Sequence, residues 1–333
     1  MRLLVAPDSF KGTLRASEVC AALARGIEAA GLEPPDLCPL ADGGEGTMEA
    51  LVLALGGDTA GATVRDPLGR EIQAGFALIE DGATAVVEVA AASGLALVAE
   101  DERDAEAATS HGTGDLIAAA IDAGAQVVLV GVGGSATTDG GAGAIEALDE
   151  AGGLRGARLV VLADVRTPFE RAAAVFAPQK GADAATVRRL ARRLERFAQR
   201  LPKDPRGVPM SGAAGGIAGG LWAAYGARLE PGAPFVLDAV DFDPRARASF
   251  AVVLGEGRLD DTTLHGKAVF EAATRARQMG VPAHAVVGQD RLDPFGKRIL
   301  DLQHVLEATD AAQLEAAGER LARQLVAETA PGG

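Results

Sequence analysis

Short apolar runs alternate along this chain with longer segments in which apolar residues recur at helical spacing. The runs at residues 3–6, 37–40, 127–130 and 159–163 predict buried strands. The segments 17–30 and 46–55, which follow the first two runs, predict helices. This alternation is typical of parallel strands joined by crossover helices, so the sequence predicts an α/β protein.

A different pattern occupies residues 58–98, where two stretches rich in alternating apolar and polar residues predict antiparallel strands. Turn residues separate them at 67–69 and 81–82. We interpret this region as the entry to a second domain.

Buried-strand runs return near the end of the chain at 251–254 and 282–287, and residues 311–327 predict an amphipathic helix. We therefore predict a discontinuous first domain with a parallel sheet, residues 1–60 and 235–333, and an α/β domain with a mixed sheet, residues 61–234, inserted in it. The length of 333 residues is consistent with two cores.

The charge balance narrows the range of partners. Thirty-two Lys and Arg against 46 Asp and Glu give a net charge of −14, which disfavours nucleic acid and anionic membrane surfaces. Cys20 and Cys38 are the only cysteines, so the sequence contains neither a disulfide framework nor a zinc spacing. The apolar run at the start is too short for a signal peptide, and no run reaches roughly 18 apolar residues. We expect a cytoplasmic protein.

One predicted helix, residues 184–201, is strongly basic on one side. Its arginines are Arg188, Arg189, Arg192, Arg193, Arg196 and Arg200. We favour a solvated basic face over a phosphate-binding role.

Charged and hydroxyl side chains gather in the loops that follow the predicted strands. Asp8, Ser9 and Lys11 follow the first strand, and Asp42 and Glu45 follow the second. Ligands of parallel sheets bind where strands end and helices begin, because helix N-termini present unpaired N–H groups. An ordinary helix start is the alternative reading of the second loop.

The glycine-rich loop at 131–141 follows the strand at 127–130 and contains Ser135 and Asp139. A strand, a glycine loop and a helix can hold phosphate oxygens with backbone N–H groups. The loop lacks the Gly-Lys-Ser/Thr of a Walker A motif and matches a dinucleotide fingerprint only loosely. Later loops add Lys180, then Glu256 and Arg258.

Phosphoryl transfer needs cations for the phosphates, a carboxylate-held Mg²⁺ and a group that orients or deprotonates the attacking hydroxyl. The loops contain all of these groups. A G-x-S-x-G elbow and a His-carboxylate cluster with structural-metal spacing are both missing from the sequence. The residues therefore favour phosphoryl transfer over hydrolysis.

Nine segments in the same order identify the chain as similar to the bacterial glycerate kinase family: APDSFKGTL, PLADGGEGT, RDPLGR, VEVAAASGLAL, TSHGTGDLI, GVGGSATTDGGAGA, FAPQKGAD, GAAGGIAGGL and GEGRLDDTTLHGKA. The resemblance runs from about residue 3 to residue 288. It implies ATP-dependent phosphorylation of D-glycerate to 2-phosphoglycerate or 3-phosphoglycerate, with Mg²⁺. It also implies two α/β domains, one of them flavodoxin-like, with the active site in the cleft between them.

The family motifs carry over residue by residue. The resemblance implies substrate binding by Asp8, Ser9, Glu45, Glu256, Arg258, Asp260 and Lys267, and nucleotide binding by Gly133, Gly134, Ser135, Gly140 and Gly141. The expected partners are D-glycerate and a nucleotide, and a homodimer is left open. Thr138 stands where the family often has Asn, Thr262 where Gln is common, and residues 163–169 depart from a Cys-Asp-Val-x-Asn-Pro-Leu pattern.

Our hypothesis for the chemistry assigns catalytic roles to Lys11, Asp42, Asp139 and Lys180. The two lysines would neutralise phosphate charge, and the two aspartates would hold the metal or activate the hydroxyl. Arg258 would bind the substrate carboxylate as a fork. The alternatives are a nicotinamide-dependent oxidoreductase, suggested by the loop at 131–136, and a silent ligand-binding regulator, suggested by Thr138 and Thr262.

Overall fold

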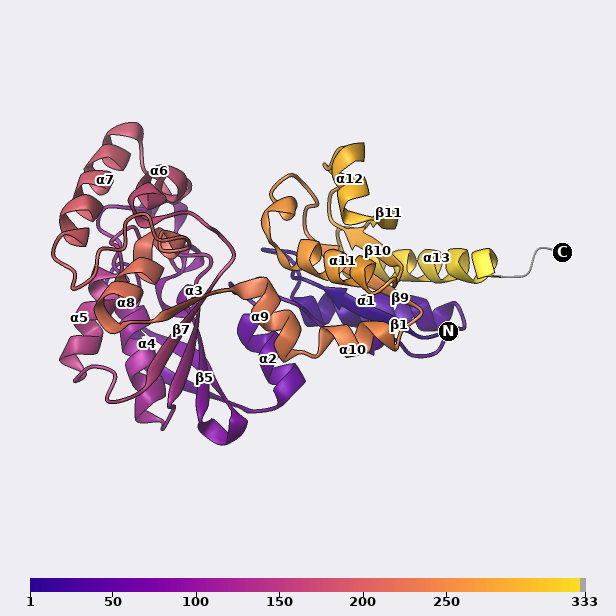
Figure 1. The fold of residues 1–333 in the computed structure, drawn as a ribbon, viewed down its shortest axis with the longest axis horizontal. Coiled ribbons are helices and arrows are strands. Elements are labelled where there is room, and N and C mark those ends of the chain that lie inside the picture. The colour runs from indigo at the N-terminus through magenta and orange to yellow at the C-terminus, as the bar shows by residue number, and fades with distance from the viewer. Residues whose placement is uncertain (330–333) are drawn as a thin grey trace. The chain divides into compact units, whose positions relative to one another are not determined.

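The computed structural model describes residues 1–329, and contacts divide them into two compact units. The first unit combines Met1–Asp42 with the residues from Ala233 onward, and the second unit is Gly43–Gly232. Figure 1 shows the chain by colour and labels the elements. Each unit contains helices and a sheet, so the predicted α/β class with one parallel and one mixed sheet is confirmed.

The first unit is built on a sheet in which every strand pairs parallel to its neighbours. Its strands are β1 (Leu3–Pro7), β2 (Asp36–Leu37), β9 (Ala251–Glu256), β10 (Ala283–Val287) and β11 (Leu302–Glu307), in the order β11-β10-β9-β1-β2. Numbered along this unit alone, the order is 2-1-3-4-5, which is flavodoxin-like. The central strands β1, β9 and β10 are buried along their whole length, which explains why their sequences are mainly apolar.

Helices surround this sheet: α1 (Ala16–Ala29), α9 (Gly232–Ala239, beginning at the last residue of the second unit), α10 (Phe242–Arg247), α11 (Ala268–Gln278), α12 (Pro294–Leu300) and α13 (Ala311–Thr329). Helices α1 and α13 lie side by side in Figure 1. Glycines permit this approach, because a Cβ at Gly26 would lie 1.9 Å from Glu315 O and one at Gly318 would lie 2.6 Å from Leu23 O. The core between them contains Leu23 and Leu314.

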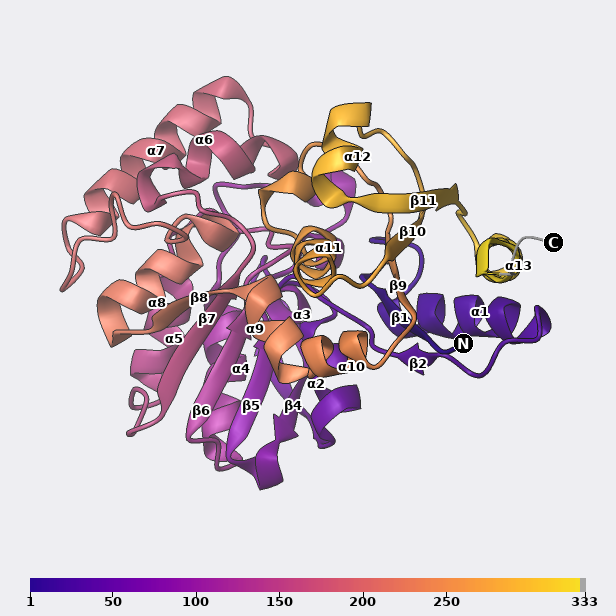
Figure 2. The same cartoon turned by 45° about the vertical axis from the view of Figure 1, so that its right-hand side comes forward.

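The second unit contains a mixed sheet in the order β3-β4-β5-β6-β7-β8. Its strands are β3 (Asp58–Arg65), β4 (Glu71–Ile79), β5 (Thr84–Glu88), β6 (Val127–Gly131), β7 (Arg158–Ala163) and β8 (Arg228–Pro231). The pairs β3–β4 and β4–β5 are antiparallel, and the pairs from β5 to β8 are parallel. The antiparallel strands predicted within residues 58–98 are therefore confirmed. Figure 2 shows β4 to β7 side by side.

The helices of the second unit are α2 (Thr47–Leu55), α3 (Val89–Ser93), α4 (His111–Asp122), α5 (Ala142–Glu150), α6 (Ala172–Phe176), α7 (Ala184–Ala198) and α8 (Ile217–Tyr225). Helix α7 buries Leu190 and Leu194 and exposes its arginines, as predicted. Two of those arginines bind Glu106: Arg189 pairs with its carboxylate, and Arg193 donates to its carbonyl. Within residues 1–329, no helix combines the length and hydropathy that a membrane span requires.

His284 in β10 is a polar side chain in the interior of the first unit, where apolar side chains are expected. Its ring is fully buried and stacks on His304 with ring centroids 5.1 Å apart. Neither ring nitrogen has a hydrogen-bond partner in the described part of the chain. Burial, together with the nearby His304, lowers the pKa of His284 to about 4, so the folded protein holds this imidazole neutral.

We predict that the contribution of His284 to stability falls as the pH drops from about 6.5 towards 4. The unfolded chain binds a proton at His284 in this range and the folded chain does not, so protonation favours unfolding. The His284 contribution to the free energy of unfolding should be about 2 kcal/mol lower at pH 5 than at pH 7.5, measured by urea titration as the difference between the unaltered protein and His284→Leu at each pH. His284→Leu should flatten this dependence, whereas His304→Gln should retain most of it. An unchanged pH dependence in His284→Leu would assign the effect to another group.

Candidate active site

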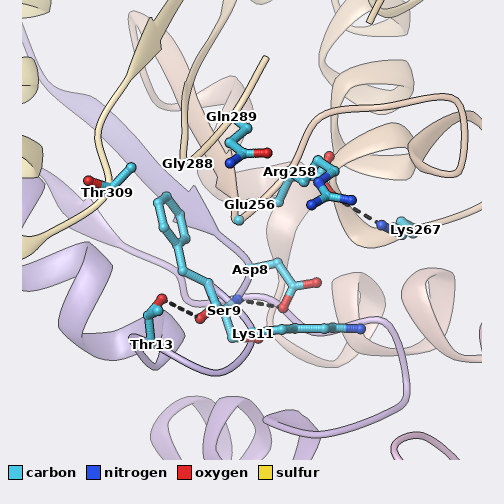
Figure 3. A pocket seen from close by; sticks show the side chains of 12 residues that line it. Asp8, Ser9, Lys11, Thr13, Glu256, Arg258, Lys267, Gly288, Gln289 and Thr309 are labelled. Atoms are coloured by element: carbon cyan, nitrogen blue, oxygen red, sulfur yellow. Dashed lines mark hydrogen bonds and ion pairs between the residues drawn. The ribbon is translucent and has the colours of Figure 1, made fainter. Parts of the chain in front are cut away.

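A pocket of about 340 Å³ opens in the first unit, where its parallel strands end. It lies next to the ends of β1 and β9, the neighbouring strands between which the strand order reverses, and such a switch point is the usual ligand site of this architecture. The lining residues are Asp8, Ser9, Phe10, Lys11, Thr13, Glu256, Gly257, Arg258, Lys267, Gly288, Gln289 and Thr309. In Figure 3, Lys11, Arg258 and Lys267 lie on one side of the pocket, and Thr13 and Thr309 lie on the other.

Asp8, Lys11 and Asp42 come together at the ends of the first two strands. Lys11 Nζ donates to Asp42 Oδ2 at 3.1 Å, and Ser9 N donates to Asp8 Oδ1 at 2.6 Å. Both aspartates are buried, with exposed fractions of 4% and 1%. Burial and then the nearby Asp42 carboxylate raise the pKa of Asp8 to about 8. This part of the pocket therefore retains a carboxyl proton near neutral pH.

Glu256 ends β9 and is buried at the pocket wall. Its Oε1 accepts a hydrogen bond of 2.7 Å from Thr263 Oγ1, and its Oε2 lies 3.5 Å from Lys267 Nζ. Burial raises the pKa of Glu256 above its usual range. The structure thus brings Glu256 and Lys267 together, and it adds Thr263, which the sequence analysis missed.

Arg258 lines the pocket and is solvent-exposed. Across residues 1–329 it forms no hydrogen bond or ion pair, so its guanidinium is available to a ligand. Asp260 is not among the lining residues. Its Oδ1 accepts from the backbone N and the side-chain hydroxyl of Thr262, which shapes the turn after β9.

Several lining residues had no chemical signal in the sequence. Gly288 and Gln289 directly follow β10, and Thr309 follows β11 by two residues. The predicted strand at 282–287 could have indicated the first two, because strand ends meet at one sheet edge. Phe10 and Thr13 stand inside the first motif and also line the pocket.

Asp139, in the second unit, is buried and engaged by four donors. Its Oδ2 accepts from Ser110 N, Ser110 Oγ and Gly143 N at 2.9, 2.7 and 3.1 Å, and its Oδ1 accepts from Gly141 N at 3.0 Å. These bonds join the N-terminal ends of α4 and α5. They leave little capacity for a metal ion, and they favour a positioning role for Asp139.

Gly140 and Gly141 are explained by packing. Both have positive φ, +73° and +82°, and a Cβ at Gly140 would lie 2.9 Å from the ring of Phe169. Their N–H groups donate to Gly215 O and Asp139 Oδ1. These two N–H groups therefore already have acceptors inside the unit. Of the residues predicted to bind phosphate through the backbone, only Gly133, Gly134 and Ser135 remain, and we call these three the backbone cradle.

Lys180 is buried beside that cradle. Its Nζ lies 2.8 Å from Ser135 Oγ and also contacts Thr137 O. Burial lowers its pKa to about 7. The N–H groups of Gly133, Gly134 and Ser135 have no hydrogen-bond partner among the residues described.

Glu45, predicted at the second loop, is exposed and does not line the pocket. The neighbouring carboxylate that the sequence analysis missed is Glu88, at the end of β5. Its Oε1 accepts from Gly46 N and Met48 N at 3.0 and 2.8 Å, and so it caps the start of α2. Burial raises the pKa of Glu88.

The described residues contain no group of three or more His, Cys, Asp or Glu side chains placed to hold a metal ion. Mg²⁺ commonly binds through one or two carboxylates together with substrate phosphates. The neighbouring carboxyl groups of Asp8 and Asp42 provide such oxygen donors, so this pair fits Mg²⁺ better than Asp139 does, whose oxygens are engaged by four donors.

Comparisons with known proteins agree with the motif order. A profile described as "Glycerate kinase family" matches residues 3–151 and 149–330. A glycerate kinase of Bacillus subtilis (strain 168) is 40% identical over 325 residues, and the glycerate 2-kinase of Escherichia coli (strain K12) is 36% identical over 324 residues. Each match covers 86% of this chain and 85% of the relative.

The fold is also similar to a solved structure. The crystal structure of a protein assigned as glycerate kinase 2 from Salmonella typhimurium LT2 matches with a TM-score of 0.83 and 33% identity. The match covers 98% of this chain and 99% of that chain.

We predict that Asp139→Asn lowers the free energy of unfolding by about 2–4 kcal/mol, because an amide nitrogen would face N–H donors that now have an acceptor. Urea titration measures this. Asp122→Asn is the matched control: it weakens only an exposed pair with Arg155, and should cost less than about 1 kcal/mol. Normal stability of Asp139→Asn with a raised Mg²⁺ requirement would instead support a metal ligand.

Proposed function

Because the chain belongs to the glycerate kinase family, as its motifs predicted, it is a kinase, and we propose that it phosphorylates D-glycerate with ATP. The name of the Escherichia coli relative favours 2-phosphoglycerate over 3-phosphoglycerate as the product. Family membership also favours this reaction over the oxidoreductase alternative. The observation that carries the proposal is the first-unit pocket, which is lined by an unpaired arginine together with two buried carboxyl groups and two lysines.

The charges of this pocket suit a monoanionic hydroxy acid. Lys11 is paired with Asp42 and Lys267 with Glu256, whereas Arg258 has no carboxylate partner in the described chain. A carboxylate that binds Arg258 as a fork would satisfy the guanidinium without separating an existing pair. Asp8, Ser9, Asp42 and Glu256 would then receive the hydroxyl groups. In this proposal Asp260 acts indirectly, by shaping the turn that carries Arg258.

The metal and the nucleotide are assigned by donor chemistry. Asp42, with Asp8, would hold Mg²⁺, which supplies charge neutralisation at the phosphates when it is bound. Lys11 adds a positive charge at the same place. The free N–H groups of Gly133, Gly134 and Ser135 would bind phosphate oxygens of the nucleotide. Thr137 and Thr138 follow this segment, and their hydroxyl oxygens are buried without a partner in the described structure.

We predict ADP release with D-glycerate and Mg·ATP, and little release with L-glycerate, tartronate or hydroxypyruvate. Phosphorus NMR of the product should show phosphate on the 2-hydroxyl. Phosphate on the 3-hydroxyl would correct the regiochemistry only. Inactivity on every hydroxy acid would reject the proposed function, and ligand-induced melting shifts without ADP release would favour the silent regulator.

We predict that Arg258→Gln raises KM for D-glycerate by about 30- to 100-fold, because the variant loses a charge-assisted fork worth roughly 2–3 kcal/mol. The kcat should change much less, since the fork binds ground state and transition state alike. Arg298→Gln, on exposed α12, is the matched control and should keep the normal KM. A normal KM in Arg258→Gln would remove Arg258 from the carboxylate site.

A further inference from the structure

Lys180 is an unusual lysine because it is buried without a counter-ion. Only 6% of the residue is exposed, and no carboxylate lies within 4.0 Å of Nζ in the described structure. Asp139 is the charged group whose field reaches the amine, but its own oxygens are engaged by four donors. Arg103 packs against Gly181, which directly follows Lys180: a Cβ at Gly181 would lie 3.4 Å from Arg103 Cβ. Burial without an adjacent carboxylate therefore disfavours the ammonium compared with an exposed lysine.

The contacts of Nζ all belong to one loop. A neutral amine can donate to Thr137 O and accept from the hydroxyl of Ser135, both of which lie within hydrogen-bond distance. The same loop carries the N–H groups of Gly133, Gly134 and Ser135, which have no partner in the described part of the chain. N–H groups without a protein acceptor therefore lie in the same short loop as the two contacts of Lys180, with no anion among the described residues to receive them.

The loop is held by packing that does not involve Lys180. A Cβ at Gly215 would lie 2.0 Å from Thr137 O, and one at Gly220 would lie 2.2 Å from Gly140 O. Gly140 N also donates to Gly215 O. These contacts fix the loop from the side of α8. We therefore expect the loop conformation to persist when Lys180 is replaced.

We propose that Gly133, Gly134, Ser135 and Lys180 form a site in the second unit for a tetrahedral dianion of the phosphoryl class, and that the anion binds together with a proton taken up by Lys180. The inference rests on the proposed function to the extent that a nucleotide phosphate would be the natural occupant. The proton comes from solvent, and no covalent bond forms or breaks.

Anion binding and proton uptake by Lys180 are coupled because the anion and the ammonium attract each other. A dianion beside Nζ stabilises the ammonium, which raises the pKa of Lys180 from about 7, and the protonated lysine in turn strengthens anion binding by the same factor. At pH 8 the free protein lacks this proton in about nine-tenths of molecules, and at pH 6 in about one-tenth. Anion affinity at this site should therefore weaken as the pH rises above 7.

The chain offers a direct measurement, because it contains five lysines: Lys11, Lys180, Lys203, Lys267 and Lys297. In protein labelled with ¹³C at lysine Cε, each lysine gives one NMR signal whose shift follows its protonation. Lys180→Met assigns the signal of interest, and Lys180→Gln is a second variant for this purpose. Sulfate is the probe, since it stays a dianion throughout the titration and mimics a phosphoryl group.

We expect the Lys180 signal to titrate near pH 7 in the free protein and at least one pH unit higher with saturating sulfate. Lys203→Met is the matched control, because Lys203 is an exposed lysine of the same unit, over the ring of Trp222. This variant should leave both midpoints unchanged.

Two results would overturn the inference. A midpoint near that of an ordinary lysine in the free protein would show that Lys180 is already charged. A midpoint near 7 that sulfate leaves unmoved, including the case in which only Lys11 or Lys267 responds, would show that no anion binds here. The glycerate assay is an independent test. If the protein responds to sulfate but does not phosphorylate glycerate, only the proposed function is rejected. If it phosphorylates glycerate but Lys180 does not respond to sulfate, only this anion site is rejected.

Discussion

The parallel pairing of β1 with β9 is the contact on which the first unit and its pocket depend. It joins Leu3 to Ala251 and Pro7 to Gly255, residues separated by most of the chain. Asp8 N extends the ladder by donating to Gly255 O at 2.8 Å. As a result the loops after the two strands share one sheet edge, where Asp8 and Glu256 line one pocket. Gly255 leaves little room on either side, because a Cβ there would lie 3.1 Å from Pro7 Cβ on β1 and 2.7 Å from Val286 O on β10.

Burial of ionisable groups is the second constraint, and both units show it. Burial and the proximity of Asp42 raise the pKa of Asp8, and burial lowers the pKa of Lys180. In each case burial shifts the equilibrium towards the neutral form. A bound cation near Asp8, or a bound anion near Lys180, would restore the charged form. Buried ionisable groups are common where charged ligands bind. Asp139 is also buried and Glu88 is partly buried, but their hydrogen bonds give them structural roles, so burial alone does not identify a ligand-binding group.

Close backbone contact governs the second unit. The glycine-rich segments at 131–141 and 212–220 pack against each other tightly: a Cβ at Gly215 or Gly220 would overlap backbone oxygens of the first segment, and one at Gly141 would lie 3.1 Å from Ile217 Cα. The same glycines are what made this loop resemble a phosphate cradle in the sequence. The distinction between a glycine needed for packing and an amide free for a ligand depends on hydrogen-bond partners, which only the folded unit shows.

The sequence by itself determined the α/β class, the antiparallel strands within 58–98 and the family, because strand and helix periods and nine ordered motifs are local properties of the chain. It also brought out Asp8, Lys11, Glu256 and Arg258, since strand ends in a parallel sheet converge. Only the tertiary structure decided which of the motif residues meet. In the folded protein Asp139 accepts four hydrogen bonds, Gly140 and Gly141 are required by packing, and Asp260 does not line the pocket. Gln289 and Thr309 line the pocket, and Thr263 donates to Glu256, although the sequence indicated none of the three. Burial and hydrogen-bond satisfaction arise between segments far apart in the chain, and no local pattern encodes them.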